Sequence, residues 1–120
     1  MDICVFNLTD NKIRNAILDV WDSGAEVRII TDDECMKNKG SDIEFLANKG
    51  IPIRTDDSER NHMHNKFALI DGKFLINGSF NWTAAAGKGN NENIMLIDHP
   101  FYLEKYMTEF ERLWNEFSAN

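Results

Sequence analysis

The chain has no basic run and few positive charges for its size. Its 120 residues carry 13 Lys and Arg against 20 Asp and Glu, which gives a formal net charge of −7. Because Lys and Arg provide most of the affinity of a protein for nucleic acid, this balance argues against tight binding of a long nucleic acid. The chain also lacks an apolar run of 18 or more residues and a charged-then-apolar opening, which mark transmembrane helices and signal peptides. We therefore expect no stable membrane anchor.

Cysteine is scarce as well. Cys4 lies in an apolar, strand-like run, Cys35 lies in a polar segment, and the two do not form a C-x-x-C pair. Isolated cysteines of this kind are typical of reduced thiols in a cytoplasmic protein, and a disulfide or a metal role is disfavoured. We expect no cofactor.

The residues that are present favour a packed globule. Hydrophobic residues make up 42% of the chain, and they include eight Phe and three Trp. This content and length are typical of a single domain, here residues 1–120. The apolar patterns alternate between strand and helix, so we expect an α/β fold with a mixed, mostly parallel sheet flanked by helices.

The expected elements follow from periodicity and from capping residues. Strands are predicted at 3–6, 27–31, 51–54, 64–70, 74–77 and 92–97. Helices are predicted at 11–22, 42–48, 82–86 and 100–117, the first capped by Thr9 or Asn11 and the last opened by His99-Pro100.

One motif, H-x-K-x4-D-x6-G-S-x-N, stands out. Its positions are His64, Lys66, Asp71, Gly78, Ser79 and Asn81. A neutral imidazole at His64 is a competent nucleophile near neutral pH. Lys66, two residues on and on the same face of a strand, can neutralise charge on the oxygens of a phosphate. The hydroxyl of Ser79 and the amide of Asn81 can donate to the same oxygens, so the motif predicts attack on a phosphodiester.

Two acidic residues have open interpretations. Asp71 precedes Gly72 between two apolar runs, which is a hairpin turn signal in its own right, so its role is structural or catalytic. Glu92 opens an apolar strand-like run. It can orient the second ring nitrogen of His64, or it can be a solvated residue at a strand end.

Cleavage of a P–O bond also needs a second proton carrier. His62 lies two residues before His64, and it is either a loop histidine or a catalytic one. The His-x-His pair hints at a metal, but no acidic or cysteine ligands with suitable spacing accompany it. A two-fold axis through the site would instead bring a second His64 opposite the first, as in a self-complementary homodimer.

At these residues the chain resembles the phospholipase D superfamily. Its small, single-motif members, the bacterial Nuc-type endonucleases and the mitochondrial (Zucchini-type) cardiolipin hydrolases or endonucleases, look most similar. The resemblance covers nearly the whole chain, including Gly24-Ala25-Glu26-Val27-Arg28-Ile29-Ile30-Thr31-Asp32, Asn48-Lys49-Gly50-Ile51-Pro52-Ile53-Arg54, Gly78-Ser79-Phe80-Asn81-Trp82-Thr83, Asn91-Glu92-Asn93 and Phe110-Glu111-Arg112-Leu113-Trp114.

The resemblance implies a phospholipase D/nuclease-like sandwich and cleavage of phosphodiesters without a metal, through a phosphohistidine. It implies His64 as nucleophile, Lys66, Ser79 and Asn81 as phosphate-binding groups, and Glu92 as the partner of the histidine. It also implies a homodimer with one composite active site. Small members of the family carry another strand and helix before the segment that begins here at Asp2, so we expect a sheet that lacks an edge.

Three functions remain open. The first is an endonuclease that cleaves single-stranded DNA or RNA. The second is hydrolysis of cardiolipin or another phospholipid, which uses the same chemistry but would profit from a membrane segment or a basic amphipathic helix that the chain lacks. The third is a domain that only binds phosphate, which the complete motif argues against. We favour the nuclease.

Overall fold

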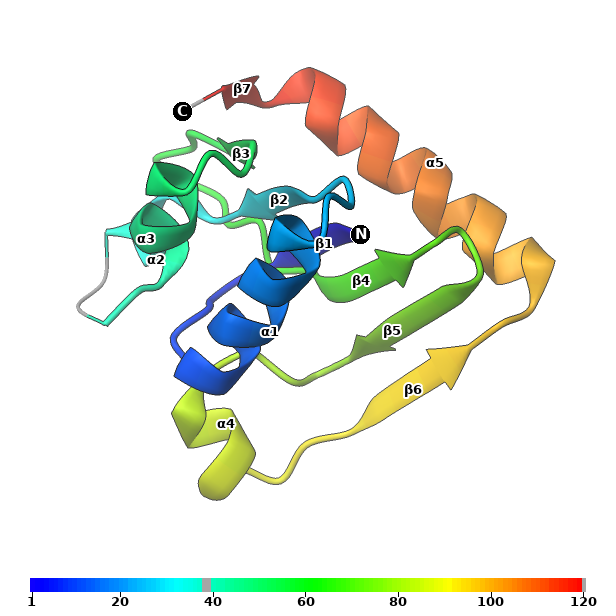
Figure 1. Cartoon of the computed structure of the whole chain (residues 1–120), viewed down its shortest axis with the longest axis horizontal. Coiled ribbons are helices and arrows are strands. Elements are labelled where there is room, and N and C mark those ends of the chain that lie inside the picture. The colour runs from blue at the N-terminus through cyan, green and yellow to red at the C-terminus, as the bar shows by residue number, and fades with distance from the viewer. Residues whose placement is uncertain (38–39, 120) are drawn as a thin grey trace.

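The computed structural model describes residues 1–37 and 40–119, and these form one sheet with helices on both faces (Figure 1). The strands are β1 (Asp2–Val5), β2 (Arg28–Thr31), β3 (Ile53–Thr55), β4 (Lys66–Ile70), β5 (Phe74–Gly78), β6 (Ile94–Ile97) and β7 (Ser118–Ala119). The helices are α1 (Asn11–Asp22), α2 (Asp33–Met36), α3 (Ile43–Asn48), α4 (Ala84–Lys88) and α5 (Pro100–Glu116).

The sheet is mixed, in the order β6-β5-β4-β1-β2-β3-β7. The predicted α/β class and mixed sheet are confirmed, but the prediction that the sheet is mostly parallel is wrong. Only the β1–β2 and β2–β3 pairs are parallel, and the other four are antiparallel. The reason lies in the connections. Helices link β1 to β2 and β2 to β3, whereas β4 and β5 are joined by a tight turn that permits only antiparallel pairing.

Each face of the sheet has its own core. Along β1 the side chains alternate, so that Ile3 and Val5 pack with Ile17 of α1 and with α3 on one face. Cys4 points to the other face and packs with Phe110 of α5. This alternation is the period-two pattern of a strand buried on both sides. It makes β1, which lies in the middle of the sheet, a rigid support for the residues that follow it.

The segment after β2 is more ordered than predicted. The polar segment around Cys35, for which no helix was predicted, contains α2, while residues 38 and 39 lie outside the described part of the chain. The side chain of Asp32 caps α2 by accepting a hydrogen bond from the Cys35 backbone N–H at 3.2 Å. Cys35 is therefore buried in a helix rather than placed in a polar loop, and both it and Cys4 are free thiols.

The two longer helices, α1 and α5, begin close to where the sequence predicts. Asp10 caps α1, rather than the predicted Thr9 or Asn11, and its carboxylate accepts from the backbone N–H groups of residues 12 and 13. His99 caps α5 and Pro100 is its first residue, as predicted. No helix in the described ranges is both long enough and apolar enough to cross a bilayer.

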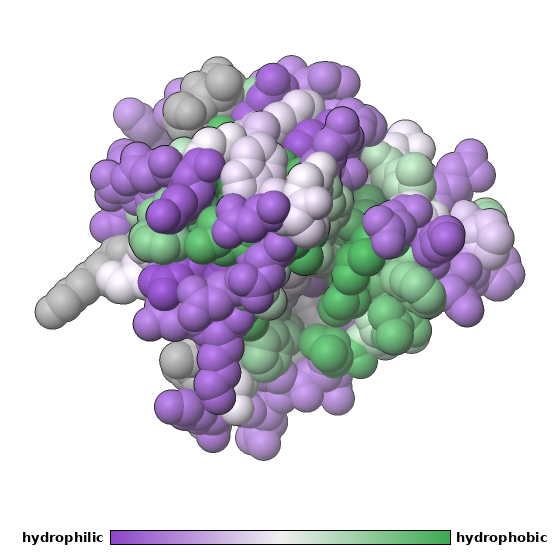
Figure 2. Space-filling view, in the orientation of Figure 1, coloured by the Kyte–Doolittle hydropathy of each residue, from purple (hydrophilic) through white to green (hydrophobic). Residues whose placement is uncertain are grey.

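Strand β6 lies at the edge of the sheet and exposes large apolar side chains. Ile94, Met95 and Leu96 are 60%, 63% and 70% exposed, and Phe74 of the neighbouring β5 is 42% exposed. Figure 2 shows apolar residues gathered over the β4–β6 side of the sheet, whereas the side that carries α1 and α3 is mostly polar at its surface. The expectation that the sheet lacks an edge element stays a prediction.

Candidate active site

The motif histidine lies at the end of the sheet where β1 and β2 finish. Because β4 runs antiparallel to β1, with Lys66 paired to Val5, the start of β4 meets the carboxyl end of β1. The backbone N–H of Phe6, just after β1, donates to the carbonyl of Asn65 at 2.9 Å. Ligands of open α/β sheets bind at this kind of edge. His64 is therefore presented on a short segment fixed to the sheet at both ends.

His64 lies two residues before β4, slightly outside the strand in which it was predicted. Its ring packs against Phe6, with 4.6 Å between the ring centroids. The Lys66 ammonium lies 3.1 Å from His64 Nδ1 and donates to the His64 carbonyl oxygen at 2.9 Å. The predicted meeting of these two side chains is thus present. Burial lowers the pKa of His64, and the charges of Lys66 and His62 lower it further.

Lys66 interacts electrostatically both with His64 and with Glu92. Burial lowers the pKa of Lys66, and the nearby Glu92 carboxylate opposes this change. An imidazole beside a half-buried ammonium is kept neutral, which is the nucleophilic form. The pair can therefore combine a nucleophile with charge stabilisation in one small volume.

Removal of the lysine charge should be visible directly on the histidine. In Lys66→Gln we expect the pKa of His64 to rise toward the ordinary histidine value of about 6.5, because one of the charges that disfavour the imidazolium is gone. The neutral form of His64, which is lost as the pH falls through its pKa, would then be lost at a higher pH. An NMR titration of the histidine ring protons measures the shift.

Lys73→Gln is the matched control, because Lys73 lies at the opposite end of the β4–β5 hairpin. An unchanged pKa of His64 in Lys66→Gln would show that burial and the other neighbouring charges set its value without Lys66.

Ser79 and Glu92 meet across the ends of β5 and β6. The Ser79 hydroxyl donates to Glu92 Oε2 at 2.6 Å and accepts from the Asn93 backbone N–H at 3.2 Å. Within one chain, and among the described residues, no carboxylate is hydrogen-bonded to His64. The role of Glu92 as the partner of the histidine therefore stays a prediction, and its contact within the chain is with Ser79.

Two amide side chains at this edge have an unsatisfied oxygen. Asn81 Oδ1 is buried without a hydrogen-bond partner, and so is Asn7 Oδ1. The two residues are close, because the backbone N–H of Trp82 donates to the Asn7 carbonyl at 3.0 Å. Buried amide oxygens are nearly always hydrogen-bonded, so these two stand out among the described residues of this edge. Asn7 was not predicted as a site residue, because it belongs to no motif.

Asp71, named among the candidate catalytic residues, is not brought to the site. It lies in the turn after β4, with φ of 56° at Asp71 and 64° at Gly72, and the Lys73 N–H donates to the Ile70 carbonyl at 2.9 Å. Two successive positive φ angles are those that a type I′ turn requires. The five residue steps from Lys66 to Asp71 correspond to about 16 Å of strand. The position fits the structural interpretation of Asp71 and not the catalytic one.

His62 has a partner that the sequence did not reveal. Its Nδ1 lies 3.2 Å from Oδ1 of Asp32, whose side chain is fully buried, and 3.9 Å from a carboxylate oxygen of Glu34. Possible metal-ligand atoms of the three residues lie within 4.8 Å of one another. The Asp32 carboxylate, however, already accepts from two backbone N–H groups besides His62. We therefore regard the group as a hydrogen-bonded support of the site and assign no metal to it.

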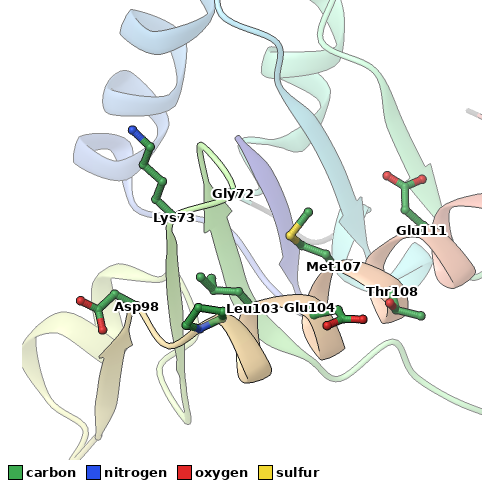
Figure 3. A pocket seen from close by; sticks show the side chains of 9 residues that line it. Gly72, Lys73, Asp98, Leu103, Glu104, Met107, Thr108 and Glu111 are labelled. Atoms are coloured by element: carbon green, nitrogen blue, oxygen red, sulfur yellow. The ribbon is translucent and has the colours of Figure 1, made fainter.

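The space in front of His64 is a polar cavity of about 310 Å³. Its lining includes Asn61, His62, Asn65 and Arg112. A larger hollow of about 760 Å³ lies elsewhere, between the β4–β5 turn and the start of α5 (Figure 3). There Leu103 and Met107 form an apolar floor under charged side chains, and none of the motif groups that surround His64 lines it. The smaller cavity is lined by His64, the proposed nucleophile, while the other motif side chains lie outside its lining, so we take the smaller cavity as the approach to His64.

Comparisons with known proteins show which family the chain resembles. Residues 1–114 match the family model described as cardiolipin synthase, PLD-like domain. The mitochondrial cardiolipin hydrolase of Chlamydomonas reinhardtii is 42% identical over 117 residues, which are 98% of this chain and 52% of that protein. The protein of the same name from Xenopus tropicalis is 39% identical over 98% of this chain and 55% of its own length. The chain thus spans about half the length of these curated relatives.

Solved structures show the same fold. Nuc of Salmonella typhimurium, a phospholipase D family member, superposes with a TM-score of 0.88 at 29% identity, over 100% of this chain and 82% of that one. NucT from Helicobacter pylori gives a TM-score of 0.88 at 26% identity, over 99% and 80% of the two chains. The sandwich expected from the sequence is thereby confirmed.

Proposed function

The chain belongs to the phospholipase D superfamily, as a single-motif member with the PLD-like domain of the cardiolipin synthases, and from this we propose that it is a metal-independent phosphodiesterase that cleaves single-stranded nucleic acid. The observation that carries the proposal is the pair of His64 and Lys66, with the ammonium 3.1 Å from the imidazole. This pair provides a neutral nucleophile and a fixed positive charge at an open edge of the sheet.

The reaction runs in two steps. A ring nitrogen of the neutral His64 attacks phosphorus, and the P–O bond to the leaving oxygen breaks while that oxygen takes a proton from a second histidine, which starts the cycle as the imidazolium. Water then attacks the phosphohistidine, the P–N bond breaks, and the second imidazole takes the proton from the water. Lys66, Ser79 and Asn81 hold the non-bridging oxygens, whose charge grows in each transition state.

The second imidazole is His64 of another copy of the chain, in a homodimer with one composite site. One chain carries one motif, and a two-fold axis beside His64 would place two such sets face to face.

Nucleic acid is favoured by the polar lining of the cavity. Its lining includes the amides, imidazole and guanidinium of Asn61, Asn65, His62 and Arg112, together with three carboxylates, those of Asp56, Glu109 and Glu116. The amides, imidazole and guanidinium suit sugars, bases and phosphates, whereas an acyl chain would need an apolar wall. Hydrolysis of cardiolipin is the second candidate, because the relatives that align over nearly the whole chain are named mitochondrial cardiolipin hydrolase.

The first test is incubation of the purified protein with end-labelled single-stranded DNA and RNA, and separately with cardiolipin vesicles, in excess EDTA. Cleavage of the strands with EDTA present, and a phosphohistidine trapped on acid quenching, are expected. Cleavage of cardiolipin alone would assign the lipid function instead. Loss of all activity in EDTA, regained on addition of a divalent metal, would contradict the metal-independent mechanism.

The composite site makes a separate prediction. Wild-type and His64→Asn chains carrying different affinity tags are co-expressed, and the mixed dimer is purified through both tags. If both His64 residues serve one site, we expect the mixed dimer to be almost inactive. Two independent sites would leave about half of the wild-type turnover, and a protein that is monomeric by light scattering would contradict the dimer itself.

A further inference from the structure

His62 is a histidine beside the nucleophile for which the proposed mechanism has no use. It lies two residues before His64, and both side chains are exposed while Met63 between them is buried. The two imidazoles pack against the same ring, since Phe6 lies 5.6 Å from the centroid of His62 and 4.6 Å from that of His64. Both residues also line the polar cavity of about 310 Å³. A ligand in this cavity therefore meets both rings.

The buried carboxylate of Asp32 fixes the orientation of the His62 ring. Asp32 is fully buried and holds the ring at Nδ1, 3.2 Å from its Oδ1, while the same oxygen accepts from the Met63 backbone N–H at 3.0 Å. The other carboxylate oxygen accepts from the Cys35 N–H at 3.2 Å. A carboxylate held by two backbone groups is a rigid support, and it leaves Nε2 on the opposite side of the imidazole, away from Asp32.

The other positively charged side chains near the cavity already have partners. Arg112 also lines the cavity, but its guanidinium is paired with Glu109 and Glu116 at 2.7 and 2.6 Å. The Lys66 ammonium contacts His64 and, in the proposed mechanism, binds the phosphate that is cleaved. When both ring nitrogens of His62 carry hydrogen, Nδ1 can donate to Asp32 while Nε2 donates to a phosphate oxygen.

We propose that His62, oriented by the buried Asp32, binds the phosphate next to the one that is cleaved in a nucleic-acid strand. Two residues of extended chain span at most about 7 Å, which is comparable with the separation of successive phosphates along a strand. His64 and His62 therefore contact two neighbouring phosphates. The proposal rests on the proposed function for its substrate class, and it explains how a chain of net charge −7 holds a strand in register.

The test measures binding, so it does not depend on turnover. A fluorescein-labelled single-stranded oligonucleotide is titrated with His64→Asn and with His64→Asn/His62→Gln over a range of salt concentrations, and Kd is obtained from anisotropy. We expect the second substitution to raise Kd about tenfold at low salt. The slope of log K against log salt should fall by about 0.7, the value for one neutralised phosphate of a single strand.

Two further variants make the result specific. His64→Asn/His62→Lys keeps a positive charge and should restore the salt slope, which a purely structural role of His62 would not predict. His64→Asn/His99→Gln removes a histidine from the start of α5 and should leave Kd and slope unchanged. The urea midpoint of each variant shows that it is folded.

Each other outcome overturns the proposal. It fails if His62→Gln leaves Kd and the salt slope unchanged, if it weakens binding without altering the slope, or if the His64→Asn protein binds no strand. A failure of the proposed function looks different: the wild type cleaves no strand, yet its binding still depends on His62.

Discussion

His64→Asn is expected to lower turnover of a phosphodiester by at least about 10⁴-fold, because loss of a nucleophile typically has effects of this size. Asn cannot form a covalent intermediate with phosphorus, while it can keep a hydrogen bond to Lys66. The side chain of His64 is exposed and packs only on Phe6 among its aromatic neighbours, so we expect the free energy of unfolding to change by less than about 1 kcal/mol. The measurements are single-turnover cleavage and urea unfolding.

His99→Asn is the matched control for the loss of a histidine. His99 caps α5 through a hydrogen bond from the Phe101 N–H to its Nδ1 at 3.2 Å, and Asn is among the best capping residues. We expect this variant to retain wild-type turnover and stability. If His64→Asn kept more than about a hundredth of the wild-type rate, a nucleophilic role for His64 would be untenable.

Gly78→Ala should have the largest effect on stability. Gly78 is the last residue of β5 and pairs with Ile94, the first residue of β6. A Cβ at Gly78 would lie 2.0 Å from the Asn93 carbonyl oxygen and 2.7 Å from Ile94 Cα, which are backbone atoms that cannot move aside alone. Relief of this overlap must displace β6, so we expect a loss of about 3 kcal/mol in the free energy of unfolding, measured by urea titration.

The same displacement should reach the site. The Ser79 N–H donates to the Asn93 carbonyl at 3.0 Å, and the Ser79 hydroxyl donates to Glu92 at 2.6 Å, so a shift of β6 separates Ser79 from both partners. A misplacement of about 1 Å can cost about 100-fold in rate, and we expect a loss of this order in the fraction that remains folded.

Gly87→Ala is the control, because its Cβ would meet nothing closer than 3.9 Å and Ala favours the helix α4 in which Gly87 lies. Equal stability of Gly78→Ala and wild type would show that β6 is free to shift.

Residues close together in the sequence were predicted well. The turn at Asp71-Gly72 was read from two residues between apolar runs, and its positive φ angles require only local sterics. The start of α5 at His99-Pro100 depends on capping by the same segment that forms the helix. His64 and Lys66 are two positions apart, so an extended backbone alone brings their side chains together.

The contacts and strand pairings that the sequence did not predict depend on the order of the strands in the sheet. Asp32 and His62 are 30 positions apart, and they meet only because β1, next to β2, also pairs with β4 in the middle of the sheet. For the same reason the sequence did not reveal that most strand pairs are antiparallel. Pairing partners are chosen by the burial of whole faces of the sheet, which no short window of sequence contains.

The sequence by itself determined the family, the nucleophile with its lysine, the turn that holds Asp71, and the limits of α5, because motif spacing, turn chemistry and capping act over a few residues. Only the tertiary structure decided that Asp71 lies at the far end of β4, that Glu92 bonds to Ser79, and that a buried Asp32 orients His62. These contacts join segments far apart in the chain, and the sheet fixes them by bringing the end of β2, the start of β4 and the ends of β5 and β6 to neighbouring positions.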